Sequence, residues 1–256
     1  MFEECFGLKF KDLIIKGDNV APKDEVKHYL KMIDMRLNGF PVQYIIGHCE
    51  FMGMDLEVGE GVLIPRDDTE VLVRQTIKQI KKLGEKLKIV DLCSGSGAVA
   101  ISMKSILGDS PEITALELSG LALNYLKRNV NKHNLDIKIM HEDIAKGYEN
   151  FMDKSIDCIV CNPPYIPSEE IEYLNSDVKK EPHLALDGGC DGLCFYRIIC
   201  DKWLSKLSEK GFAAVEIGRG QGRSVCDIFR KKGLENIKVY KDINNIERVV
   251  IAKYSK

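Results

Sequence analysis

The 256-residue sequence has no long apolar run and little net charge. No stretch approaches the ~18 apolar residues that suggest a membrane-spanning helix, and no basic segment followed by an apolar one opens the chain. We therefore expect neither a membrane span nor a secretory leader. The formal net charge of −2 lacks the basic excess that is usual in dedicated nucleic-acid binders, so nucleic acid is not an expected partner.

The nine cysteines lack the pattern of a disulfide framework or a metal site. Their spacing is irregular for a chain of this length. Cys158 and Cys161 form a CxxC, but on a strand their side chains would point to opposite faces, and no second CxxC completes a zinc site. We therefore predict buried thiols, no metal and a reducing, cytoplasmic location.

Three regions of the chain differ in periodicity. Residues 1–40 are helical in pattern, and the apolar residues of 23–38 share one helical face. Residues 41–63 contain short strand-like runs interrupted by glycines, which predicts a β-hairpin. We predict a small N-terminal helical module that docks a substrate, a hairpin linker over 41–63, and a catalytic domain over 64–256.

The third region begins with a helix and then alternates strands and helices. Ile64 to Glu70 leads into an amphipathic helix, in whose first turn Asp67, Asp68 and Glu70 suit capping and the helix dipole. From residue 87 the alternation predicts an α/β fold, with a mostly parallel sheet and helices on both faces. Two closing strands, at 236–240 and 248–252, are close enough in sequence to form an antiparallel pair at one edge.

A glycine-rich loop follows the first strand of this sheet, with the sequence Asp91-Leu92-Cys93-Ser94-Gly95-Ser96-Gly97. Glycines there let the backbone approach a ligand at the carboxyl end of the strand. Gly95, Gly97 and Ala100 also fit the G-x-G-x-x-A pattern of dinucleotide sites. Asp91 favours S-adenosylmethionine instead, because a carboxylate suits its cationic amino group and would repel a pyrophosphate.

Two further acids follow the next strands. Glu117 ends the second strand, where it could accept hydrogen bonds from ribose hydroxyls of either ligand. Asp143 follows the third strand, near the expected position of an adenine amino group, and Ile144 would pack against the base.

The fourth strand of the sheet ends at Asn162-Pro163-Pro164-Tyr165. Prolines cannot donate ladder hydrogen bonds and fix φ, so the strand must stop there in a stiff turn. The Asn162 amide oxygen and the Pro163 carbonyl can then grip both hydrogens of a planar NH2 group, and Tyr165 can stack on its face. Such acceptors orient an amide nitrogen and stabilise the charge it gains during in-line methyl transfer. This chemistry needs no histidine, so His48, His133, His141 and His183 are interpreted as ordinary surface or core residues.

These motifs resemble the HemK/PrmC-type glutamine methyltransferases that modify peptide chain release factors. The glycine loop alone is typical of class I methyltransferases, and Asn-Pro-Pro-Tyr indicates an acceptor with a planar nitrogen. Asp67 departs from the family pattern, which usually has proline there. The matching segments, which span most of the chain, include Pro41–Gly47, Leu63–Arg66 with Thr69-Glu70, Asp91–Gly97, Asn162–Ile166, Glu181-Pro182, Gly188-Gly189, Asp191–Leu193, Glu216–Gly218, Gln221-Gly222 and Arg248–Val250.

The resemblance implies a Rossmann-like, class I fold with a seven-stranded sheet. It implies that residues 93–97 and Glu117 bind S-adenosyl-L-methionine, which leaves as S-adenosyl-L-homocysteine, and that Asn162 to Tyr165 hold the glutamine of a release factor. We expect a monomer. An adenine-N6 methyltransferase, a ribosomal-protein glutamine methyltransferase and an inactive scaffold are alternatives. An adenine-N6 methyltransferase would need a region that recognises nucleic acid, and the residues after Tyr165 leave no room for one. An inactive scaffold would be expected to have a damaged acceptor motif.

Overall fold

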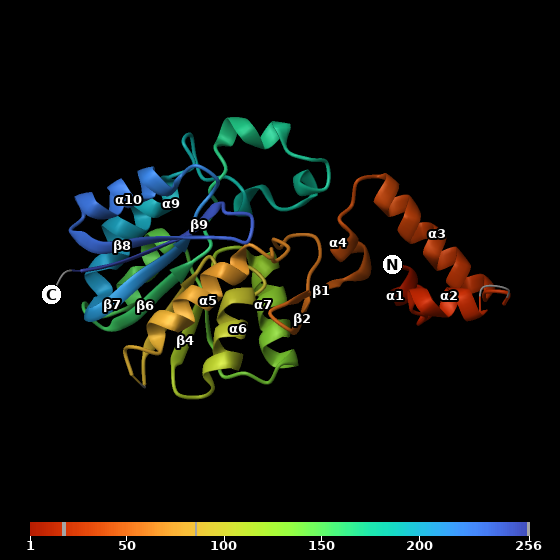
Figure 1. Cartoon of the computed structure of the whole chain (residues 1–256), viewed down its shortest axis with the longest axis horizontal. Helices are drawn as coiled ribbons and strands as arrows, with labels where there is room; N and C mark the ends of the chain where they lie inside the picture. The colour runs from red at the N-terminus through yellow and green to blue at the C-terminus, as the bar shows by residue number, and fades with distance from the viewer. Residues whose placement is uncertain (17–18, 85, 255–256) are drawn as a thin grey trace.

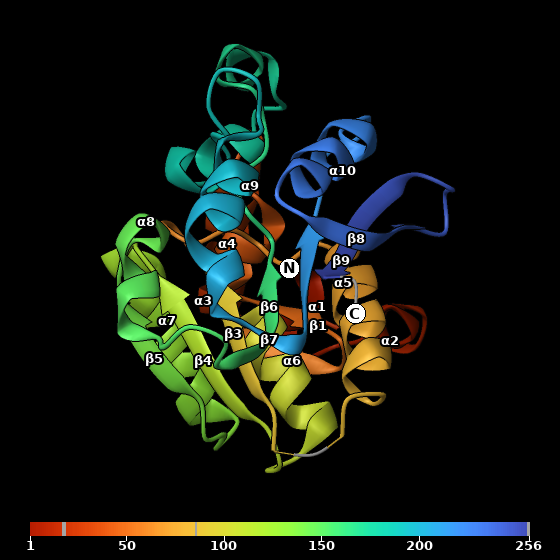
Figure 2. The same ribbon diagram turned by 90° about the vertical axis from the view of Figure 1, so that its left-hand side faces the viewer.

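The computed structural model describes residues 1–16, 19–84 and 86–254. Its largest part is a seven-stranded sheet in the order β5-β4-β3-β6-β7-β9-β8, which Figure 2 shows from β5 at the left to β8 and β9 at the right. Neighbouring strands are parallel from β5 to β7, whereas β9 is antiparallel to β7 and β8 is antiparallel to β9. The predicted α/β fold and its antiparallel edge are confirmed. The strands are β3 (Lys88–Leu92), β4 (Glu112–Glu117), β5 (Lys138–His141), β6 (Ile156–Cys161), β7 (Leu207–Glu216), β8 (Leu234–Lys241) and β9 (Glu247–Tyr254).

Helices cover both faces of this sheet because successive strand residues point to opposite sides. Ile89 and Cys158 pack with α5 (Thr69–Ile80), α6 (Ala98–Leu107) and α7 (Gly120–Lys132). Val90 and Cys161 pack on the other face with α8 (Ile144–Gly147), α9 (Cys194–Ile198) and α10 (Gly222–Lys231). Cys158 and Cys161 are thus free, buried thiols on opposite faces, as predicted.

The chain after α9 and the chain between β6 and α9 are irregular. After α9 a π-helical turn (Ile199–Trp203) and a 3-10 turn (Leu204–Lys206) lead into β7. Residues 167–193, called the strap below, hold short 3-10 turns and project from the sheet in both views (Figures 1 and 2). These turns are η2 (Ser168–Tyr173), η3 (Val178–Lys180) and η4 (His183–Ala185); η1 (Tyr148–Asn150) precedes β6.

The described N-terminal residues form four helices, of which the first three stand apart from the sheet (Figure 1). They are α1 (Phe2–Phe6), α2 (Phe10–Lys16), α3 (Lys23–Leu37) and α4 (Val42–Ile46). The rings of Phe2, Phe6 and Tyr29 pack with centroids 5.0–6.1 Å apart, and Met32 is the buried residue of α3. No helix in the described part of the chain is long and apolar enough to cross a membrane.

A two-stranded hairpin, β1 (His48–Phe51) and β2 (Met54–Glu57), follows these helices. It turns at Met52 and Gly53, which both have positive φ. Two-residue hairpin turns of this kind match the right-handed twist of the flanking strands. The hairpin is shorter than the predicted 41–63 segment, because helix α4 follows Pro41, its N-cap, and ends at Gly47, which has the left-handed conformation.

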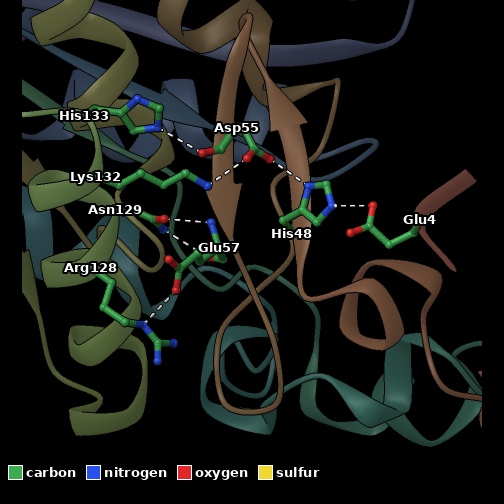
Figure 3. Close-up of polar contacts among 8 residues, drawn as sticks. All are labelled: Glu4, His48, Asp55, Glu57, Arg128, Asn129, Lys132 and His133. Carbon is green, nitrogen blue, oxygen red and sulfur yellow. Dashed lines mark hydrogen bonds and ion pairs between the residues drawn. The ribbon is translucent and has the colours of Figure 1, made fainter. Parts of the chain in front are cut away.

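Polar contacts pin the hairpin onto α7 (Figure 3). Asp55 pairs with Lys132 at 2.7 Å, and Glu57 pairs with Arg128 at 3.0 Å. His48 lies between Asp55, at 2.7 Å, and Glu4 of α1, at 3.2 Å. The pKa of His48 is therefore raised, chiefly by its hydrogen bond to Glu4.

Asn129 on α7 makes the buried contacts of this group. Its Oδ1 accepts from the Glu57 N–H at 2.7 Å, and its Nδ2 donates to the Glu57 carbonyl at 3.0 Å and to the Ser96 carbonyl at 2.9 Å. The side chain is completely buried. One amide group therefore joins the hairpin, α7 and the glycine loop.

We expect Asn129→Leu to lower the free energy of unfolding by about 2–4 kcal/mol, because it leaves the Glu57 and Ser96 backbone groups without their partner. Urea denaturation of both proteins measures the difference. Asn131→Leu, the same change at an exposed position of α7, should stay within about 0.5 kcal/mol of the unsubstituted chain. Equal losses in the two variants would contradict the role of Asn129.

Candidate active site

The glycine loop makes a sharp turn between β3 and α6. Cys93, Gly95 and Gly97 all have positive φ. Gly97 has a φ of +88°, which strains other residues, and a Cβ there would lie 2.6 Å from Leu126 and 2.9 Å from Ile101, so those side chains would have to shift. The Ser94 N–H donates to the Leu116 carbonyl at 3.0 Å, which ties the loop to the end of β4.

Glu117, the last residue of β4, lies beside this loop. One carboxylate oxygen accepts from the Gly95 N–H and the other from the Ser119 N–H, each at 2.7 Å. Burial raises the pKa of Glu117, and the backbone donors oppose that rise. Each oxygen can accept a second hydrogen bond, so the carboxylate is available to a ligand hydroxyl.

Asp91 also borders the loop, but its carboxylate faces the start of α6. Its Oδ2 accepts from the Ala100 N–H at 3.2 Å, and the side chain is buried. Burial raises its pKa to about 7. Asp91 therefore braces the loop against α6 in addition to lining the adjacent cavity.

Asp143 and Ile144, after β5, line the same cavity. Asp143 caps α8, where its Oδ1 accepts from the Ala145 N–H at 2.8 Å. Ile144 is buried, and its carbonyl accepts from the indole N–H of Trp203 at 2.8 Å. The sequence did not point to Trp203. A lone tryptophan in a helical segment gives no indication that its indole N–H will reach the Ile144 carbonyl, 59 residues earlier in the chain.

These segments enclose a cavity of about 950 Å³, which includes the part open to solvent. Of the residues predicted to bind a cofactor, only Gly97 is not part of its lining, because Gly97 packs against Leu126 and Ile101 instead. Thr69 and Phe195 also line the cavity, and sequence reasoning missed both. The predicted residues that the cavity brings together are Asp91, Cys93, Ser94, Gly95, Ser96, Glu117, Asp143, Ile144 and Asn162.

A second cavity of about 650 Å³, which also includes solvent-open space, is lined in part by the turn at Asn162 to Tyr165, called the acceptor turn below. Arg66, Pro163 and Tyr165 belong to its lining, whereas Pro164 faces the first cavity. Asn162 lines both. The asparagine thus stands where the two cavities meet.

The acceptor turn itself is held from two sides. Asn162 Nδ2 donates to Thr69 Oγ1 at 3.1 Å, and no described residue donates to its Oδ1. The Tyr165 carbonyl accepts from Gln221 Nε2 at 2.9 Å. A Cβ on Gly188 would lie 2.7 Å from the Tyr165 Cα, so the backbone of the strap packs directly on the turn. Burial raises the pKa of the Tyr165 phenol.

Glu181 joins the strap to the segment before α5. Its side chain is buried, and it accepts from the Ile64 N–H at 3.0 Å and from the Arg66 guanidinium. The Ile-Pro-Arg and Glu-Pro segments noted in the sequence therefore meet beside the second cavity.

Two family descriptions match this chain. Residues 67–177 match the methyltransferase small domain, and residues 1–47 match the PrmC N-terminal domain.

Curated relatives are similar over nearly the whole chain. The release factor glutamine methyltransferase of Clostridium botulinum is 39% identical over 245 residues, which cover 94% of this chain and 85% of that protein. The release factor glutamine methyltransferase of Thermodesulfovibrio yellowstonii is 37% identical over 257 residues, which cover 98% of this chain and 90% of that protein.

Solved methyltransferase structures share the fold at low sequence identity. The hMettl16 catalytic domain in complex with MAT2A 3′UTR hairpin 6 superposes with a TM-score of 0.65 at 16% identity, covering 86% of this chain and 84% of that chain. A ribosomal protein L11 methylase from Lactobacillus delbrueckii superposes with a TM-score of 0.54 at 15% identity, covering 78% and 86% of the two chains. The fold and the family indicate S-adenosyl-L-methionine as the methyl donor.

We expect S-adenosylmethionine and S-adenosylhomocysteine to raise the melting temperature, and NAD and NADP to leave it unchanged. The reason is that the Asp91 carboxylate borders the loop on which a pyrophosphate would have to sit. A ligand at 100 times its Kd adds about 2.7 kcal/mol to the free energy of unfolding, which a thermal shift assay detects easily. Stabilisation by NAD alone would contradict this interpretation of the loop.

Proposed function

The chain belongs to the release factor glutamine methyltransferase family, and we propose that it methylates the side-chain amide nitrogen of the glutamine in the Gly-Gly-Gln motif of peptide chain release factors. The observation that carries this proposal is the position of Asn162. It lies at the junction of two cavities, and its amide oxygen accepts no hydrogen bond from a described residue. One cavity then suits the methyl donor and the other the methyl acceptor.

The residues of the first cavity fit S-adenosylmethionine. We propose that Glu117 accepts from the ribose hydroxyls and that Asp143 lies near the adenine amino group. Ile144 and Phe195 offer apolar surface for the base. Cys93 to Gly97 supply a tight backbone turn for the methionine part. When bound, this donor supplies an electrophilic methyl group on a sulfonium, and it leaves as a neutral thioether.

The acceptor turn addresses the difficulty of this reaction. An amide nitrogen is a poor nucleophile, because its lone pair is delocalised into the carbonyl. The Asn162 Oδ1 and the Pro163 carbonyl can accept the two hydrogens of the glutamine NH2 group, and the Tyr165 ring can stack on its plane. Positioned acceptors orient the nitrogen for in-line attack and stabilise the positive charge that it gains. The proton can leave after the methyl group has been transferred.

The N-terminal helices and the hairpin complete the proposal. We propose that residues 1–40 dock the folded release factor and that residues 64–256 carry out catalysis. Residues 41–63 link these two parts. We also propose that the enzyme works as a monomer in the cytoplasm. Its nine free cysteines suit a reducing compartment, and one chain supplies all the residues assigned to the site.

Substitution of Asn162 tests the acceptor assignment. We expect Asn162→Ala to lower kcat by about 100-fold or more, because one positioned acceptor is lost, and to leave S-adenosylmethionine affinity nearly unchanged. A methyl-transfer assay and calorimetry on the same preparation measure both quantities. Asn244→Ala, at an exposed turn outside both cavities, should retain normal turnover. Normal turnover in Asn162→Ala would exclude the proposed role.

The choice of acceptor can be tested with labelled methyl donor and three candidates. These are an intact bacterial-type release factor, the same factor with alanine in place of the Gly-Gly-Gln glutamine, and duplex DNA. We expect mass spectrometry to find one added methyl group, on that glutamine of the intact factor alone. Label in the DNA, or equal label in the alanine variant, would show that the acceptor is a different one.

A further inference from the structure

Thr69 contacts the proposed catalytic asparagine directly. It is the first residue of α5, and it is 3% exposed. Its Oγ1 accepts the hydrogen bond from Asn162 Nδ2 at 3.1 Å. This contact joins the segment before the sheet to the acceptor turn.

The orientation of the Asn162 amide decides whether it can serve as an acceptor. The oxygen and the NH2 group of a carboxamide have nearly the same size, so packing alone does not distinguish its two flipped forms. With the NH2 group turned to Thr69, the oxygen is left for a substrate. In the flipped form, an NH2 group would face the NH2 group of the glutamine, and two donors would meet.

A threonine hydroxyl alone does not select between these forms, because it can both donate and accept. Its proton must be held elsewhere if the oxygen is to act only as an acceptor. The neighbouring group that can take the proton is Glu216, at the end of β7, which is 1% exposed and whose carboxylate interacts with the Thr69 hydroxyl. An ionised carboxylate only accepts hydrogen bonds, so a Thr69 hydroxyl that donates to Glu216 presents a lone pair to Asn162.

The surroundings of Glu216 support this direction. Its Oε2 is buried without a hydrogen-bond partner among the described residues, and its Oε1 lies 3.5 Å from the Tyr165 hydroxyl. Burial raises the pKa of Glu216 to about 7, and interaction with the Thr69 hydroxyl opposes that rise. Above that pH the carboxylate is mainly ionised and acts only as an acceptor. Asp68 raises this pKa and Arg248 lowers it, and these two side chains pair with each other at 2.7 Å.

We propose that Thr69 is a positioning residue, which together with Glu216 holds the Asn162 amide with its oxygen toward the methyl acceptor. This inference rests on the proposed function of the acceptor turn.

The start of α5 differs from the prediction in one further respect. Asp68 does not cap that helix with its side chain, contrary to the interpretation from sequence, because it pairs with Arg248.

Turnover of Thr69 variants tests the proposal. Thr69→Val keeps the shape but loses the hydroxyl, and we expect kcat to fall roughly 10- to 100-fold with the KM for S-adenosylmethionine unchanged. Thr69→Ser keeps the hydroxyl, and we expect kcat within about threefold of the unsubstituted enzyme. Thr76→Val is the matched control: Thr76 lies on the same helix, is completely buried, and its Oγ1 has no partner among the described residues. Normal kcat in Thr69→Val, or equal loss in Thr76→Val, would overturn the proposal.

A second readout does not depend on turnover. In ¹⁵N-labelled protein, the side-chain NH2 signals of Asn162 can be identified by their loss in Asn162→Ala. We expect them to shift and to exchange faster with solvent in Thr69→Val than in Thr76→Val. Unchanged signals would overturn the inference even if turnover falls. If Thr69→Val does not fold, Thr69→Ala supplies the same comparison with a smaller side chain.

The two readouts separate the two proposals. An unsubstituted enzyme that transfers no methyl group to the release factor would contradict the proposed function, and the amide signals would still test the orientation of Asn162. An active enzyme that is insensitive to loss of the Thr69 hydroxyl would contradict the positioning role alone.

Discussion

The parallel pairing of β3 with β6 is the constraint on which the rest of the site depends. It places Leu92 opposite Cys161, so the glycine loop and the acceptor turn begin at the same edge of the sheet. The pairing of β3 with β4 on its other side brings Glu117 to that edge as well. Strand order reverses at β3, and open α/β sheets bind ligands outside the carboxyl ends of the strands at such a point. The two cavities that Asn162 lines lie at this edge.

The sequence predicted the order of elements well, because each depends on local periodicity and on glycine or proline at its ends. The β6 strand and the turn after it are an example: an apolar run stops at Pro163, where ladder hydrogen bonding must end. The glycine loop could also be predicted from the sequence. Its backbone has positive φ values, which glycine adopts more readily than other residues. Helix α4 was missed, because a five-residue helix shows too little periodicity to distinguish it from a strand.

What the sequence could not predict is which distant residues touch. Thr69 was noted only as part of a matching segment, and its contact with Asn162 appears only once α5 has packed against β7 and β9. The same holds for Glu181, whose buried carboxylate meets Arg66 and the Ile64 N–H across the site. Asp68 looked like a helix cap, but a guanidinium from β9 competes for its carboxylate. Such contacts depend on the tertiary arrangement and leave no mark on local patterns.

The bridging amide of Asn129 also has a consequence for how the molecule opens. A two-stranded hairpin alone is at best marginally stable in water, yet this one shares buried hydrogen bonds with α7 and the glycine loop. Its backbone amides should therefore exchange with solvent only in openings that also disrupt the sheet domain. The helices of α1 to α3, with Met32 as the buried residue among those described, have no comparable anchor. Local unfolding of these helices would therefore leave intact the hydrogen bonds that join the hairpin, α7 and the glycine loop.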